Sequence, residues 1–193
     1  MKILLTLFVL LFSSSVVADD IRDFQIEGMS VGDSLLDYMT EYEIKKEIKL
    51  NLNRYKYLEK NKFVDVWKYE GLKTYDEMFF FVKPEDERYL IYDINGVIDF
   101  TNDFNGCKKK QQEITEVFSK ILTDTKKDEG TYIHQVDPSN KSIIIYVRFK
   151  FDSGGTILIQ CYDHEESYRI KNNILDVLEV SISSPEIIKW FRP

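Results

Sequence analysis

Apolar and polar residues alternate along the second half of the chain, and this pattern predicts β-strands there. The alternation runs from Ile143 to Phe151, and a second run reaches Cys161 after a turn at 152–155. A period of two residues is typical of a strand with one buried face. We therefore expect a β-hairpin here, and a further strand from Leu175 to Ser183.

Shorter segments of the first half are rich in aromatic and β-branched residues. Residues 63–67 and 78–82 have this composition, which favours strands. The apolar residues of 89–100 are interrupted by Asn95-Gly96, and this dipeptide favours the positive φ angles of a type I′ turn. We expect a second hairpin with its turn at these two residues.

Apolar residues recur at helical spacing in other places. The longest helix is predicted near 107–122, with apolar side chains on one face and lysine and glutamate on the other. Thr40 begins a capping-box pattern, and Ser34 is expected to cap a separate short turn of helix before it. Ser184 followed by Pro185 predicts a final short helix.

Hairpins dominate this pattern, and strands and helices do not alternate regularly. The expected fold class is α+β: an antiparallel sheet of hairpins with helices packed mainly on one face. No internal repeat or linker rich in proline and glycine divides the chain, so a single mature domain is expected.

The first eighteen residues have the pattern of a cleavable secretory signal peptide. A lysine follows the initiator methionine, residues 3–12 are almost entirely apolar, and Ala18 stands at the cleavage position. Residues 1–18 are therefore predicted to be removed, leaving 19–193 as a periplasmic or secreted domain. No later apolar stretch approaches the ~20 residues that a membrane span needs.

The charge of the chain bears on its partners. The net charge of −7 becomes −8 when Lys2 leaves with the signal peptide (−7 − 1). A nucleic acid would require a basic stripe, and the two lysine clusters, 108–110 and 126–127, are expected to be solvated surface. We therefore expect no nucleic-acid partner. The candidate partner is a protein of the cell envelope.

Cys107 and Cys161 are the only cysteines. In an oxidising compartment such a pair is expected to form a disulfide bond. Cys107 lies on the apolar face of the predicted long helix and Cys161 on that of a strand, so a helix lying across the sheet would bring them together. The alternative is a metal site of both cysteines with His134 and His164, although their spacing matches no zinc pattern.

Residues 32–35, Gly-Asp-Ser-Leu, resemble the signature of the GDSL esterases and lipases, in which the serine is the nucleophile. That resemblance implies a parallel α/β fold and a late Asp-x-x-His, yet neither His134 nor His164 has an aspartate three positions before it. A serine without an aligned base is not activated. Helix capping is therefore the favoured role of Ser34.

His134 and His164 are the other candidates for acid–base chemistry, because carboxylates stand near both in the sequence. Both are predicted in polar loops, where solvated histidines are usual. No phosphate-binding loop, dinucleotide fingerprint or strong metal-ligand spacing is present in the sequence, so no cofactor or metal is expected.

Residues 23–38, with Cys107 and residues 161–163, resemble a group of small exported proteins of unknown function from AT-rich marine bacteria. Gly28-Met29-Ser30 also resembles the start of small outer-membrane-assembly lipoproteins, whose lipidated cysteine is missing here. The hypothesis from the sequence is a non-catalytic binding or assembly module of the cell envelope. The alternative is an esterase-like hydrolase that uses Ser34 with a loop histidine.

Overall fold

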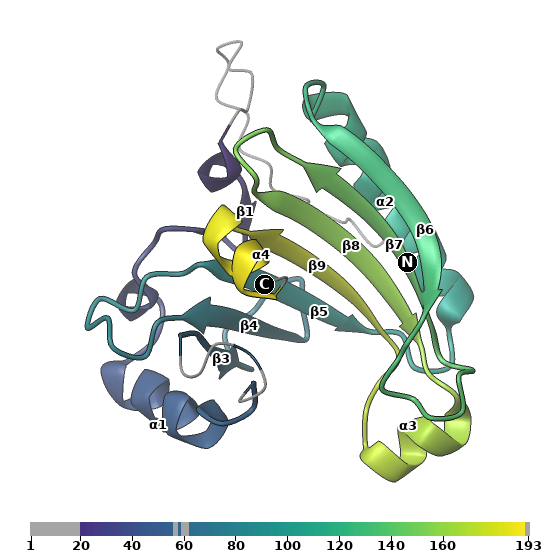
Figure 1. Cartoon of the computed structure of the whole chain (residues 1–193), viewed down its shortest axis with the longest axis horizontal. Coiled ribbons are helices and arrows are strands. Elements are labelled where there is room, and N and C mark those ends of the chain that lie inside the picture. Colours follow the sequence, from purple (N-terminus) through teal and green to yellow (C-terminus); the bar gives the residue numbers. More distant parts are fainter. Residues whose placement is uncertain (1–19, 56–57, 59–61, 192–193) are drawn as a thin grey trace.

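A seven-stranded antiparallel sheet forms the centre of the molecule (Figure 1). The computed structural model describes residues 20–55, 58 and 62–191, so the expected signal peptide lies outside the described residues. The strand order is β3-β4-β5-β9-β8-β7-β6. The strands are β3 (Val64–Lys68), β4 (Glu77–Val82), β5 (Asp93–Asp99), β6 (Lys126–Ile133), β7 (Ile143–Lys150), β8 (Thr156–Asp163) and β9 (Val177–Ser183).

In the described part of the chain, four α-helices and two short 3-10 helices accompany this sheet, together with a small hairpin. No helix of the described residues is long and apolar enough to cross a bilayer. The expected α+β class is confirmed. The further elements are η1 (Ile21–Asp23), β1 (Gln25–Ile26), β2 (Met29–Ser30), η2 (Leu35–Asp37), α1 (Glu41–Asn51), α2 (Phe104–Ile121), α3 (Glu166–Asn172) and α4 (Pro185–Phe191).

One face of the sheet carries the main core, because every second residue of each inner strand is apolar and points there. The two longest helices cover this face. Ile44 of α1 is fully buried beside β3, and α2 packs on β8 and β9 behind the sheet in Figure 1. Strand residues of this core include Val66, Phe80, Ile94, Val180, Ile182, Ile159 and Phe149.

The opposite face carries a smaller apolar cluster under α4, which lies in front of the sheet in Figure 1. Ile187 and Trp190 of α4 pack against Phe63 and Phe81. The prediction of helices mainly on one face therefore holds for α1 and α2, whereas α4 covers the other face. Beside this cluster the second face becomes polar, because the alternate residues of β5, β8 and β9 there are largely polar.

The hairpin predicted at Asn95-Gly96 is wrong. Strand β5 runs through both residues without a turn, and Gly96 pairs with Met78 on one side and Val180 on the other. A Cβ atom at Gly96 would lie 2.5 Å from the ring of Tyr75, so this glycine allows a side chain to cross the strand closely. The turn signal was local, and packing between distant residues prevailed over it.

Most other elements agree with the sequence pattern. Thr40 and Glu43 form the expected capping box at the start of α1, and the hairpin of β7 and β8 has the expected turn. Of the elements that were not predicted, β6 and α3 are the longest. Residues 126–129 are largely exposed, as expected, but they begin an edge strand, and Glu165 caps α3 where a polar loop was expected.

Candidate functional site

A disulfide bond between Cys107 and Cys161 joins α2 to β8, with 6.0 Å between the Cα atoms. Both residues are fully buried. The predicted pairing is confirmed, and with it the docking of this helix across the sheet. Because each sulfur is bonded to the other, neither is a thiolate ligand, and the alternative metal site of these cysteines with His134 and His164 is wrong.

Ser34 has the bonds of a helix cap. Its hydroxyl accepts the N–H of Leu36, at 3.3 Å, and donates to the carbonyl of Arg88, at 2.7 Å. Ser34 lies beside Leu90, before the start of β5, while the histidines follow the far ends of β6 and β8 at the other end of the sheet. Among the described residues, no hydrogen bond joins Ser34 to a histidine.

Replacing Ser34 with alanine should lower the free energy of unfolding by about 1 kcal/mol, because one capping bond is lost. Chemical denaturation measures this change, with Ser34→Thr as the control that keeps the hydroxyl. We expect no effect of Ser34→Ala on any ester hydrolysis by the purified protein. A variant of normal stability that loses such an activity would contradict the capping role.

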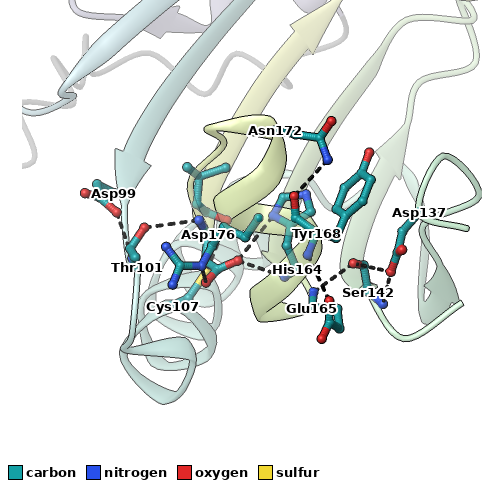
Figure 2. Close-up of polar contacts among 12 residues, drawn as sticks. Asp99, Thr101, Cys107, Asp137, Ser142, His164, Glu165, Tyr168, Asn172 and Asp176 are labelled. Carbon is teal, nitrogen blue, oxygen red and sulfur yellow. Dashed lines mark hydrogen bonds and ion pairs between the residues drawn. The ribbon is translucent and has the colours of Figure 1, made fainter. Parts of the chain in front are cut away.

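The two histidines, 30 positions apart in sequence, lie against each other (Figure 2 shows His164 and its surroundings). Their ring centroids are 5.3 Å apart, and both rings contact Tyr162. The Nδ1 atom of His164 is 3.2 Å from Oδ1 of Asp176, which also accepts the backbone N–H of His164 at 2.8 Å. The sequence pattern did not predict the contact of His164 with Asp176, because Asp176 follows α3, an element that was not predicted.

The pair of His164 and Asp176 resembles the base and orienting carboxylate of a hydrolase, but it is closed to solvent. The exposed fractions of the two side chains are 7% and 10%. The backbone N–H of Asp176 donates to Thr101, and its carbonyl accepts the N–H of Phe100. Asp176 therefore fastens the segment after β8 to the segment after β5, a structural task.

His134 lies beside this pair in a less polar setting. Burial lowers the pKa of His134, and the nearby His164 lowers it further, while Asp137 opposes both effects. Nδ1 of His134 is buried without a hydrogen-bond partner among the described residues. Asp137 is itself occupied, since it accepts bonds from the backbone and hydroxyl groups of Ser139 and Ser142. No nucleophilic hydroxyl in the described structure is hydrogen-bonded to either histidine.

A chain of hydrogen bonds crosses the polar half of the second face. Asn95 donates to Asp93 at 3.0 Å, and Ser181 donates to Asn95 at 2.5 Å and lies 3.2 Å from Glu179. The chain continues beyond Glu179. Tyr162 is hydrogen-bonded to Glu179 and, at 3.3 Å, to Gln160, whose amide donates to Tyr132 at 2.7 Å.

Two carboxyl groups in this chain of hydrogen bonds have raised pKa values. Burial raises the pKa of Asp93 to about 6, against the opposing effect of hydrogen bonds from Asn95 and Ser183. Burial also raises the pKa of Glu179 to about 7, and the charge of Asp93 adds to the effect. The Ser181 hydroxyl donates its single proton to Asn95. A protonated Glu179 can therefore be the donor, and the Ser181 oxygen the acceptor, in the contact between these two residues.

A groove of about 770 Å³ runs between α2 and the sheet edge formed by β6. It exists where α2, which packs on β8 and β9 and reaches β7 through Gln111 and Phe118, no longer covers the sheet. The floor includes Ile145 and Val147, and the walls are polar, with Thr115 and Gln112 on the helix and Thr131 on the strand. The helix is held in place by Gln111, whose amide donates to the carbonyls of Ile145 and Ile159.

Sequence reasoning missed this groove, although one signal was present. Cys107, Gln111 and Thr115 are spaced by four residues and therefore share one stripe of the helix, and all three are buried. Two polar residues on a buried stripe indicate a helix face that contacts backbone groups or a ligand. Comparison with protein-family models, with curated proteins and with solved structures found no match to this chain.

Proposed function

We propose that this chain is an exported, non-catalytic binding module of the cell envelope that works through the groove between α2 and β6. The observation that carries the proposal is the groove itself, whose volume falls within the ~300–1,000 Å³ of typical ligand sites. The disulfide bond supports export, because such bonds persist mainly in oxidising compartments.

The arrangement of the candidate catalytic residues supports binding over hydrolysis. A serine hydrolase needs its nucleophile within hydrogen-bond reach of a base. Ser34 instead caps η2 at one end of the sheet, and the pair of His164 and Asp176 is buried at the other. The groove is open and combines an apolar floor with many polar groups, as binding sites do.

A photoreactive residue placed in the groove tests the proposal. Ser119 is exposed on the groove wall, so we expect Ser119→p-benzoylphenylalanine, in the full chain expressed in a bacterial periplasm, to form a defined adduct under ultraviolet light. The protein recovered should begin at Asp19. Glu70, exposed before β4, is the control position. Identical adducts from both positions, or none from Ser119, would count against a binding role for the groove.

A further inference from the structure

Strand β6 is an edge of the sheet beside the groove, and its outward backbone groups have no hydrogen-bond partner among the described residues. The N–H of His134 bonds to the carbonyl of Ser142, and the register of β6 with β7 is unbroken from there. In an antiparallel pair, every second residue exchanges hydrogen bonds with the partner strand. Residues 126, 128, 130 and 132 therefore bond to β7, whereas 127, 129, 131 and 133 direct their N–H and C=O groups outward.

We propose that an extended polypeptide segment of another protein adds to β6 as an eighth strand, at the edge of the sheet beside the groove. This inference rests on the proposed function and names the partner's chemistry. Outward N–H and C=O groups at every second residue are satisfied by the main chain of an extended peptide. Side chains on one side of that peptide would then lie beside Thr131 at the mouth of the groove.

The composition of β6 indicates where the segment pairs. Edge strands are commonly protected by charged residues, and 126–129, Lys-Lys-Asp-Glu, protect the first half of β6 in this way. The second half, 130–133, has no charge, and Tyr132 and Ile133 are 43% and 48% exposed. Val136, just beyond, is also exposed. The unprotected half is therefore the place where an added strand would gain apolar contacts.

A second copy of this chain matches the edge less well than an uncharged segment does. Antiparallel pairing of two β6 strands over their full length would place the charged half of each copy against the apolar half of the other. Charges facing apolar residues across a strand pair are unfavourable. A segment of a different protein that is uncharged opposite 130–133 can pair along the whole of β6 without this mismatch, and a second copy paired over 130–133 alone is an outcome that the test distinguishes.

The test uses a phage library of random linear ten-residue peptides, selected against the folded protein. The enriched peptide should bind Thr131→Pro about tenfold more weakly than the unchanged protein, because proline removes one outward N–H. Bonds between β6 and β7 do not use that N–H, so the variant should keep its circular dichroism spectrum. Thr131→Val, which retains the N–H, should bind more tightly than Thr131→Pro, and Glu70→Gln, at an exposed position away from the groove, should bind normally.

A second measurement does not depend on the variants. N-methylation of the peptide, one residue at a time, should abolish binding to the unchanged protein at alternate residues only. Loss at every residue or at none, equal binding by Thr131→Pro, or failure to enrich any peptide would overturn the proposal. So would a dimer in sedimentation that Thr131→Pro dissociates, since the occupant would then be a second copy. An adduct at Ser119 without an enriched peptide would leave the binding module standing with another class of ligand.

Discussion

Reduction of the bond between Cys107 and Cys161 should lower the free energy of unfolding by about 4 kcal/mol. The bond closes a loop with a sequence separation of 54 residues, and the loss of this constraint from the unfolded chain has about that value in the chain-entropy model. In a protein of this size the melting temperature should fall by roughly 8–16 °C. Thermal unfolding with and without a phosphine reductant measures the shift.

A variant with Cys107→Ala and Cys161→Ala is the matched control for this experiment. It should melt at a lower temperature than the oxidised protein, and the reductant should not change its melting temperature. If the unchanged protein also melts at one temperature under both conditions, the bond does not limit the unfolded chain as argued.

Stability should fall as the pH rises from about 4 to above 7. The pKa values of Asp93 and Glu179 in the folded protein, about 6 and about 7, lie above the ~4 of carboxyl groups in an unfolded chain. Between these values the folded state binds more protons than the unfolded state, so the free energy of unfolding decreases with rising pH. The loss is on the order of 2–3 kcal/mol for each carboxyl group.

Other groups set the acid limit. Hydrogen bonds from Arg148 hold the pKa of Asp128 at about 2. The contribution of Asp128 to the free energy of unfolding is therefore complete above pH ~4 and is lost as the pH falls from there through its pKa of about 2. We therefore expect the greatest stability near pH 4–5, followed by a decline toward neutral pH.

Variants separate the two buried carboxyl groups from the rest of the protein. Glu179→Gln keeps the size of the side chain but cannot ionise, so its stability should decline less with rising pH. Compared with the unchanged protein, the variant should therefore fare better at pH 8 than at pH 5. Asp93→Asn should act in the same direction, whereas Glu70→Gln, at an exposed position, should leave the profile unchanged. Urea denaturation at several pH values measures all three. An unchanged slope in Glu179→Gln would contradict the argument.

The sequence predicted the elements whose signals are local. The capping box of α1, the hairpin of β7 and β8 and the amphipathic α2 each follow from spacing within a few residues, and all are present. The disulfide was predictable because two independent patterns placed both cysteines on apolar faces. The turn predicted at Asn95-Gly96 was wrong because the role of Gly96 depends on its contact with Tyr75, which is distant in the sequence.

The hydrogen-bonded polar residues of the second face and the histidine pair were less predictable, since their members meet only through the sheet order. Glu179 and Gln160 are neighbours because β9 pairs with β8, and Asn95 joins them because β5 pairs with β9. Alternation in β9 does place Glu179 and Ser181 on one face. It does not show that Glu179 is buried there, and burial is the main cause of the raised pKa values of Asp93 and Glu179. The contact of His134 with His164 depends on β6. This strand was not predicted, because its first residues are charged and were expected to be solvated surface.

The position of β9 determines when the sheet can be completed. This strand comes after all the others in the chain, yet it joins β5 to β8 across the middle. Until residues 177–183 have been synthesised, no strand joins the three strands on one side to the three on the other, and β5 and β8 each expose an open edge. Such edges promote association between chains. The incomplete chain therefore passes through an interval with four free strand edges instead of two.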